Sequence, residues 1–153
     1  MYENEYKAQQ FALKWHKDQK YGDKPYSYHL GKVALYVDRA FLKDKNYVTL
    51  AMIALLHDVV EDTACTFECI GNEFSDYCQV DELVKAIDAI TKRESESRAE
   101  YISRCAANQL ALKVKFADTL ANLDCSVSDM DIRRIEKYSK QLHQINKLLQ
   151  KAA

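Results

Sequence analysis

The fold is decided by residues 50–63, which read Leu50-Ala51-Met52-Ile53-Ala54-Leu55-Leu56-His57-Asp58-Val59-Val60-Glu61-Asp62-Thr63. The first seven residues are apolar on every side of a helix, and a helix of that kind lies in the middle of its domain. Four of the next seven side chains can carry charge. We therefore expect one helix from Asn46 to about Asp62 that is buried for most of its length and acidic where it ends.

Composition favours helices on both sides of this stretch. The 153 residues include three glycines and one proline, whereas average usage would give about ten and about seven. A fold of many short strands needs such residues at its turns, so we predict an all-α fold. The length fits a single domain, assigned to residues 1–153. Apolar periodicity and helix-start signals place the other helices at about residues 2–20, 28–39, 67–74, 79–91, 100–108, 110–123 and 129–150.

The last predicted helix carries an apolar stripe with spacings of three and four residues, formed by Ile132, Ile135, Tyr138, Leu142, Ile145 and Leu149. Such a stripe marks the buried face of a helix. We expect it to close the core of the monomer. The alternative is a seam between two copies of the chain, so the sequence allows a monomer or a homodimer.

Charge, cysteine usage and hydropathy exclude several classes of protein. The 22 Lys+Arg against 23 Asp+Glu lack the basic excess of a general nucleic-acid binder, although a local basic pocket stays possible. The five cysteines are odd in number and show no C-x-x-C spacing, which favours free thiols in a reducing compartment. The N-terminal residues do not resemble a signal peptide, and the apolar run is far shorter than the roughly 18 residues of a membrane span. We expect a cytoplasmic protein that binds neither nucleic acid nor membrane.

The acidic end of the buried helix predicts a divalent-metal site. On a continuous helix His57 and Glu61 share one face, and Asp58 and Asp62 share the next. Carboxylates near a helix C-terminus are repelled by the helix dipole, and unpaired charge next to a core is costly. A divalent cation would offset both effects. The alternative is an ordinary helix end that reaches solvent.

Two other segments supply further ligands. His29 lies at the start of a helix, after the Gly22–Pro25 turn, and Asp118 ends a mostly apolar approach, with Asn122 one helical turn later. Two imidazoles with two carboxylates form a mixed nitrogen and oxygen set that suits Mn, Fe or Zn better than Ca. The remaining histidines lie on polar helix faces, and we expect both at the surface: His16 and His143.

The order His29 … His57-Asp58 … Asp118 resembles the H…HD…D signature of the HD-domain metal-dependent phosphohydrolases. The string from His57 to Thr63 is similar to the HDxxED box of the alarmone hydrolase branch, which includes the hydrolase domain of Rel/SpoT enzymes and small stand-alone hydrolases. Other stretches resemble the PYxxH, VTK and KxADxxxN motifs of that branch, in the same order: Pro25-Tyr26-Ser27-Tyr28-His29, Ile90-Thr91-Lys92 and residues 114–122. The resemblance covers about residues 5–150.

This resemblance implies a fold, a reaction and a set of residue roles. The fold would be the compact helical bundle of an HD domain. The reaction would be removal of the 3′-pyrophosphate from the small nucleotide guanosine 3′,5′-bis(diphosphate), ppGpp, by a metal-activated water. One Mn²⁺ would be held by His29, His57, Asp58 and Asp118. The attacking water would be positioned and deprotonated by Glu61 and Asp62. The substrate would be contacted by Lys20, Tyr21, Lys92 and Asn122. Asn122 would either contact the ribose or support the residues of the site.

The chain departs from the family in the loop before His29. Lys20-Tyr21 stands where the family has Arg-Lys, and Leu30 stands where it has proline. Lys20 keeps one cation there, and Tyr21 offers a ring that can stack on a purine. Two other functions stay open: an HD-type nucleotidase or nucleoside triphosphate hydrolase, and a nucleotide-binding module with an inactive site. Further candidate phosphate contacts are Lys24, Arg98, Arg104 and Lys115.

Overall fold

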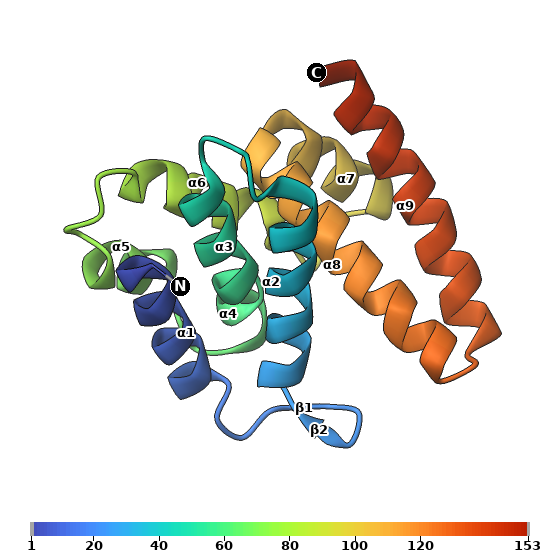
Figure 1. The fold of residues 1–153 in the computed structure, drawn as a ribbon, viewed down its shortest axis with the longest axis horizontal. Coiled ribbons are helices and arrows are strands. Elements are labelled where there is room, and N and C mark those ends of the chain that lie inside the picture. The colour runs from blue at the N-terminus through green and yellow to red at the C-terminus, as the bar shows by residue number, and fades with distance from the viewer. Residues whose placement is uncertain (1, 153) are drawn as a thin grey trace.

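Helices dominate the computed structural model, which describes residues 2–152 (Figure 1). The helices are α1 (Glu3–Trp15), α2 (Ser27–Phe41), α3 (Tyr47–Leu56), α4 (Val59–Asp62), α5 (Phe67–Glu73), α6 (Val80–Ile90), α7 (Arg98–Ala107), α8 (Gln109–Ser128) and α9 (Ile132–Ala152). A ribbon of two very short strands, β1 (Lys20–Tyr21) and β2 (Lys24–Pro25), joins α1 to α2. The all-α prediction is therefore confirmed.

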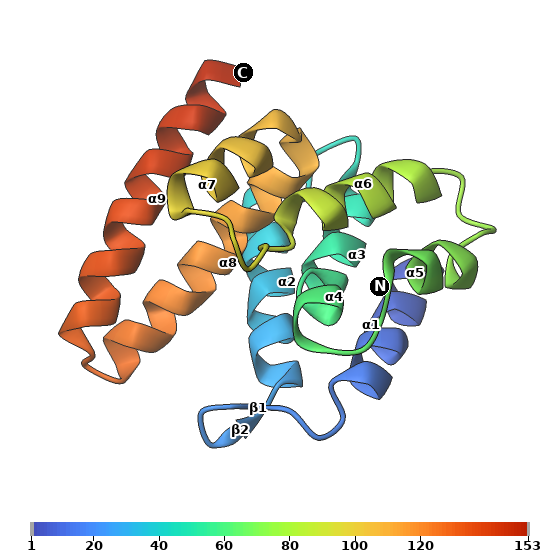
Figure 2. The same ribbon diagram turned by 180° about the vertical axis from the view of Figure 1, so that it is seen from behind.

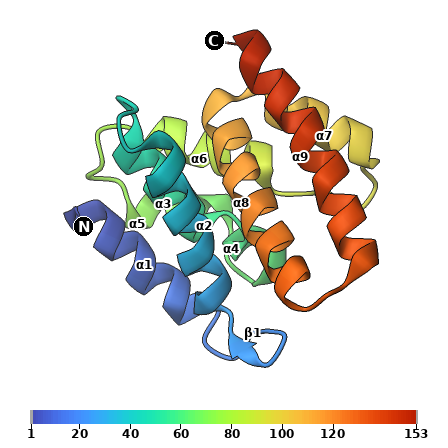
Figure 3. The ribbon, with the colours of Figure 1, turned by 45° about the vertical axis from the view of Figure 1, so that its right-hand side comes forward.

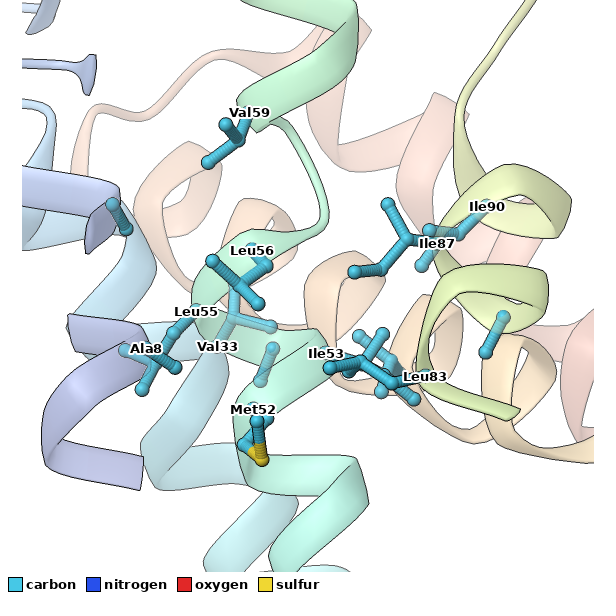
Figure 4. Packing of buried hydrophobic residues seen from close by; sticks show 14 of the residues in the cluster. Ala8, Val33, Met52, Ile53, Leu55, Leu56, Val59, Leu83, Ile87 and Ile90 are labelled. Atoms are coloured by element: carbon cyan, nitrogen blue, oxygen red, sulfur yellow. The ribbon is translucent and has the colours of Figure 1, made fainter. Parts of the chain in front are cut away.

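Helix α3 forms the centre of the molecule. Every residue from Thr49 to Leu56 is buried, because α3 is surrounded by α1, α2, α6 and α8. Figure 4 shows side chains of α3 lying between Val33 of α2 and the isoleucines of α6. A helix that is apolar on all sides needs neighbours on all sides, and the chain supplies them. The polar residues that follow α3 are held at the edge of this core.

Helices α8 and α9 form an antiparallel hairpin, with α7 beside it (Figures 2 and 3). Ile145 of α9 is fully buried in a second apolar cluster with residues of α7 and α8, including Ile102 and Leu112. The expectation that the last helix closes the core of the monomer is confirmed. Ile132 does not belong to the buried stripe as predicted. It is 64% exposed, because it lies at the turn where α9 begins.

The connection between α1 and α2 differs from the prediction. Helix α1 ends at Trp15 instead of about residue 20, and the chain then reverses through the β1–β2 ribbon. Tyr21 pairs with Lys24 in this ribbon, and Gly22 between them has φ 64°. A positive φ of this size suits glycine, which has no Cβ to clash with the backbone. The ribbon therefore fixes Tyr21 beside the start of α2.

The predicted continuous helix over residues 46–62 is wrong. Helix α3 ends at Leu56, and α4 begins at Val59 as a separate short helix. The His57 ring explains the break, because its Nδ1 lies 2.9 Å from the Ala54 carbonyl oxygen, which a continuous α-helix would pair with the backbone of residue 58. The acidic residues at the end of the quoted stretch therefore lie in the first turn of α4. The dipole of α3 therefore does not disfavour these carboxylates, contrary to what the sequence indicated.

Polar side chains define several other helix ends. Thr66 caps α5, because its hydroxyl accepts from the Cys69 N–H at 3.1 Å. Asn108 caps α8 by accepting from the backbone of Leu110 and Ala111. Among residues 2–152, none of the helices combines the length and apolar character needed to cross a bilayer.

Candidate active site

Four side chains predicted as metal ligands meet where four helices converge. His29 comes from the first turn of α2, His57 follows the last turn of α3, Asp58 precedes α4, and Asp118 lies in the middle of α8. Ligand atoms of His29, His57 and Asp118 all lie within 4.8 Å of one another, and all three residues are buried. The buried core thus places two imidazoles and two carboxylates around one point.

The spacing of these atoms suits a shared cation. His29 Nε2 lies 3.4 Å from Asp118 Oδ1 and 3.6 Å from Asp58 Oδ2. His57 Nε2 lies 2.9 Å from Asp58 Oδ2 and 3.8 Å from Asp118 Oδ1. Ligands about 2.1 Å from a metal ion and roughly at right angles are about 3.0 Å apart, close to these separations. The residues present therefore fit a divalent metal.

His57 is held in the orientation that a metal ligand needs. Its Nδ1 faces the carbonyl oxygen of Ala54, and a carbonyl can only accept, so Nδ1 carries the proton. The buried Nε2 faces the carboxylates of Asp58 and Asp118 instead, at 2.9 and 3.8 Å. Metal-binding histidines characteristically donate one ring N–H to a carbonyl or carboxylate and present the other nitrogen to the ion.

Asp118 is supported by two other residues of α8. Lys115 Nζ donates to Asp118 Oδ2 at 2.8 Å, and Asn122 Nδ2 donates to Oδ1 at 2.6 Å. Burial by itself would raise the pKa of Asp118, but Lys115 and the two histidines outweigh this effect and hold the pKa below its ordinary value. Asp118 therefore stays ionised, with Oδ1 on the side of His29 and His57.

Asp58 receives support from the start of α2. The hydroxyl of buried Tyr26 donates to Asp58 Oδ2 at 2.5 Å. Burial and the adjacent Asp58 raise the pKa of Tyr26 far above its ordinary value, so the hydroxyl keeps its proton at neutral pH. Tyr26 belongs to the PYxxH-like stretch, but the sequence did not predict this contact.

Divalent-metal binding to this cluster is expected to release a proton. Burial lowers the pKa of His29, but hydrogen bonds and charge from Asp118 and Asp58 outweigh it and raise the pKa to about 9. A metal must displace that proton, so Mn²⁺ affinity should rise with pH, by about tenfold per unit below pH 9 for one proton. Calorimetric titration in buffers of different ionisation enthalpy measures the release. The exposed variant His143→Ala serves as the control, and an affinity that does not change between about pH 6.5 and 8.5 would contradict the assignment.

The two carboxylates predicted to handle the water lie on α4, and each is held by another segment. The Lys92 N–H donates to Glu61 Oε2 at 2.8 Å, and Gln19 Nε2 donates to Asp62 Oδ2 at 2.7 Å. Partial desolvation raises the pKa of Glu61, and the negative charges of the neighbouring aspartates add to this shift. A raised pKa makes a carboxylate a stronger base at neutral pH.

His16 is buried, and the prediction that it lies at the surface is wrong. Its ring stacks on Tyr26 with centroids 4.6 Å apart, and its Nδ1 lies 2.6 Å from Gln19 Oε1. His16 thereby connects the side chains that hold Asp58 and Asp62. Because it lies just after the last residue of α1, at the C-cap, its position on a helical face gave the wrong exposure. His143 is exposed as predicted.

A cavity of about 280 Å³ opens beside the metal cluster. One wall is formed by His29, Asp58, Asp118 and Asn122, and α7 and α9 contribute the opposite side. Cationic residues lining it are Lys92, Arg98, Lys115 and Lys137. The sequence predicted no site role for Lys137, because a surface lysine on a long amphipathic helix carries no distinguishing signal. It also missed Gln141, and it placed Tyr138 on the apolar stripe of the last helix instead of in the cavity.

Three predicted cationic contacts lie elsewhere. Lys20 is exposed and borders a different hollow, whereas Tyr21 faces the cavity. The two side chains diverge because successive residues of a strand point to opposite sides. Lys24 lies over the Tyr28 ring at 4.0 Å. Arg104 is engaged inside the protein, where it donates to Glu96 and to the carbonyls that end α6.

Tyr21 stacks on a predicted metal ligand. Its ring lies 4.8 Å from the His29 ring with an interplanar angle of 11°. Its hydroxyl donates to Asn122 Oδ1 at 2.9 Å and accepts from Arg134 Nη2 at 3.0 Å. Burial is the main cause that raises the pKa of Tyr21 to about 12. One face of the ring predicted to stack on a purine is thus occupied by His29, and Asn122 is engaged at both ends of its amide.

Known proteins similar to this chain include two relatives and one solved structure. Guanosine-3′,5′-bis(diphosphate) 3′-pyrophosphohydrolase MESH1 of Danio rerio is 30% identical over 149 residues, covering 90% of this chain and 79% of that protein. A protein of Mycobacterium leprae (strain TN) named "Probable GTP pyrophosphokinase" is 34% identical over 85 residues. That match covers 50% of this chain and spans only 10% of the relative.

A solved structure shares the fold. It is a metazoan orthologue of SpoT that hydrolyses ppGpp, with a TM-score of 0.74 and 22% identity, and the match covers 99% of this chain and 94% of that one. No family model matches the sequence.

Proposed function

The chain belongs to the family of the guanosine-3′,5′-bis(diphosphate) 3′-pyrophosphohydrolases, and from this premise we propose that it hydrolyses ppGpp to GDP and pyrophosphate with the help of Mn²⁺. The observation that carries the proposal is a single cavity with a metal-ligand cluster on one wall and unneutralised cations around the rest. A substrate with a diphosphate at both the 3′ and the 5′ position requires both features.

The metal would be held by His29, His57, Asp58 and Asp118. When bound, a divalent ion at this point supplies positive charge that activates water and reduces the repulsion between the nucleophile and the phosphate oxygens. The mixed imidazole and carboxylate set favours Mn²⁺ over Ca²⁺. The residues that hold these ligands in place, Tyr26 on Asp58 and Lys115 on Asp118, fix the cluster before substrate arrives.

Glu61 and Asp62 are assigned to the attacking water. The water oxygen forms a bond to the phosphorus attached to the ribose 3′ oxygen, and the bond between that phosphorus and the 3′ oxygen breaks. The carboxylate of Glu61 accepts a proton from the water and later releases it to solvent, and the 3′ oxygen takes up a solvent proton and leaves as a hydroxyl of GDP. The Lys92 N–H on Oε2 keeps the Glu61 carboxylate oriented for this transfer.

Lys92, Arg98 and Lys137 are assigned to the phosphate groups. None of the three forms an ion pair with a described residue, whereas Lys115 is used to hold Asp118. Their side chains come from the loop before α7, from α7 itself and from α9. Charges supplied by separate elements on one cavity can bind a substrate whose two diphosphates are far apart.

Replacing Lys137 by methionine is expected to raise KM for ppGpp about tenfold while kcat changes little, because a hydrogen bond to a charged group contributes about 1.5–3 kcal/mol and this one would form equally in ground and transition states. Steady-state kinetics at saturating Mn²⁺ measures both constants. Lys140→Met, on the exposed side of the same helix, is the matched control. An unchanged KM would remove Lys137 from the phosphate site.

The proposed function is tested by a nucleotide panel assayed with Mn²⁺ and with a chelator. The panel contains ppGpp, GTP, deoxynucleoside triphosphates and nucleoside monophosphates. The expected result is consumption of ppGpp alone or far ahead of the others, abolished by the chelator. Preferred turnover of a monophosphate or triphosphate would support an HD-type nucleotidase or triphosphate hydrolase instead. Metal and ppGpp binding with no turnover of any nucleotide would support an inactive binding module.

A further inference from the structure

Tyr21 and Arg134 join distant parts of the chain at the metal cluster. Tyr21 lies on β1, and Arg134 lies in the first turns of α9. Arg134 Nη2 donates to the Tyr21 hydroxyl at 3.0 Å, and the same hydroxyl donates to Asn122 Oδ1 at 2.9 Å. Since Asn122 Nδ2 donates to Asp118 Oδ1 at 2.6 Å, a hydrogen-bond chain runs from α9 to a metal ligand.

The Tyr21 ring contacts a second metal ligand directly. It stacks on His29 at 4.8 Å with an interplanar angle of 11°. Tyr26 lies edge-on to Tyr21 at 6.4 Å and to His29 at 5.6 Å. The Nδ1 atom of His29 has no hydrogen-bond partner among the described residues. The orientation of this imidazole is therefore set by the aromatic rings around it and by its carboxylate neighbours.

Arg134 is itself anchored, so the hydrogen-bond chain has a fixed end. Its Nη1 lies 3.8 Å from Asp129 Oδ2, and its guanidinium lies 5.9 Å from the Tyr138 ring. The backbone N–H of Arg134 donates to Asp131 Oδ1 at 3.1 Å, in the turn between α8 and α9, and this bond fixes the start of α9. The guanidinium thus approaches Tyr21 from the α8–α9 hairpin.

The geometry points to a positioning role: Tyr21, held by Arg134, orients both His29 and Asp118 and so sets the affinity of the site for a divalent metal. This inference rests on the proposed function, because it concerns the metal used there. The tyrosine is neutral and provides both a stacking face and a hydroxyl.

The test is a Mn²⁺ titration of the full chain and of single and double variants. Tyr21→Phe keeps the ring and removes the hydroxyl, and Arg134→Met keeps an apolar stem beside Tyr138 and removes the donors. Each single variant should bind Mn²⁺ about tenfold more weakly, the low end of the effect of removing a residue that orients a metal ligand. The double variant should bind no more than about twofold more weakly than the weaker single one, because both changes break the same chain.

Two control variants change the same residue types at nearby positions that do not contact the metal cluster. Tyr28→Phe removes a nearby phenol hydroxyl, and Arg133→Met removes an exposed arginine of the same helix turn; both should leave Mn²⁺ affinity unchanged. Circular dichroism and thermal unfolding of the metal-free variants show whether each one folds. If one single variant does not fold, the Mn²⁺ affinity of the other single variant tests the positioning role. As a second readout, the loss of turnover in Tyr21→Phe should disappear at saturating Mn²⁺.

Variants with the affinity of the unmodified chain would overturn the inference. Losses that multiply in the double variant would also overturn it, because they would show that the two residues act separately. The readout is independent of the proposed reaction. A chain that binds Mn²⁺ and hydrolyses no nucleotide would contradict the proposed function, yet weakened Mn²⁺ binding in Tyr21→Phe would still support the positioning role.

Discussion

Substitution of His57 by alanine is expected to abolish pyrophosphate release and to weaken Mn²⁺ binding by more than about 100-fold. Loss of a residue that merely orients a ligand costs 10–100-fold in metal affinity, and loss of a ligand costs more. His57 is the ligand with its Nδ1 fixed by the Ala54 carbonyl and its Nε2 facing the carboxylates of the cluster. Equilibrium Mn²⁺ binding and a pyrophosphate-release assay measure the two effects.

The control for this substitution is His143→Ala. That histidine is exposed on α9, and its loss should change neither Mn²⁺ affinity nor rate. Far-ultraviolet circular dichroism checks that the His57 variant retains its helices, since the replaced side chain is buried. Asp58→Asn offers a second variant of similar volume at the same site. Normal Mn²⁺ affinity in both folded variants would exclude the assigned cluster as the metal site.

Replacement of Glu61 by glutamine is expected to reduce kcat by about 10²–10⁴-fold, the usual contribution of a positioned general base. Mn²⁺ affinity should change little, because Glu61 is not among the assigned ligands. The amide oxygen of glutamine can still accept from the Lys92 N–H, so the local structure is retained. Single-turnover kinetics at saturating Mn²⁺ isolates this effect from metal binding.

Glu68→Gln is the matched control, because Glu68 is an exposed carboxylate in the first turn of α5. It should retain the full rate. The pH dependence gives a further criterion when Mn²⁺ is kept saturating at every pH: the rate of the unmodified chain should fall at low pH as Glu61 becomes protonated, and in Glu61→Gln this fall should disappear. A Glu61→Gln chain that keeps most of its rate would assign the base to another residue, with Asp62 the nearest candidate on α4.

The fold was predictable where hydrophobic patterning is strongest. Residues 50–56 are apolar on all sides, and α3 is the buried central helix that this pattern predicts. The hydrophobic pattern does not reveal where a side chain takes the place of a backbone N–H at a backbone carbonyl. The break after Leu56 depends on a His57 ring that lies against the Ala54 carbonyl, and periodicity alone gave one continuous helix.

The predicted metal ligands lie together because each one ends or begins an apolar segment of the core. Such apolar segments can be recognised in a sequence. Because the segments pack together in the core, the residues that flank them lie close to one another. Contacts made by residues outside this pattern were not predictable. Lys137 reaches the cavity only because α9 folds back along α8, and Tyr21 reaches His29 only because the ribbon turns at Gly22.

His16 was predicted to be exposed and is buried, which again shows that periodicity does not reveal side-chain contacts at a helix end. On a helical wheel of the predicted helix, His16 lies on the polar face. Helix α1 ends before His16, however, and the side chain turns inward to Tyr26 and Gln19. Exposure could not be judged at a helix end whose position was itself misplaced by about five residues. The supporting contacts of Asp58 and Asp62 therefore became visible only in the structure.

The measurement that tests the central claim most directly is phosphorus nuclear magnetic resonance of ppGpp incubated with the purified chain and Mn²⁺. With spectra recorded after a chelator has removed the paramagnetic Mn²⁺, we expect equal amounts of GDP and pyrophosphate, no inorganic phosphate, and no reaction when a chelator replaces Mn²⁺ from the start. Release of inorganic phosphate, or ppGpp that remains intact in the presence of bound Mn²⁺, would contradict it.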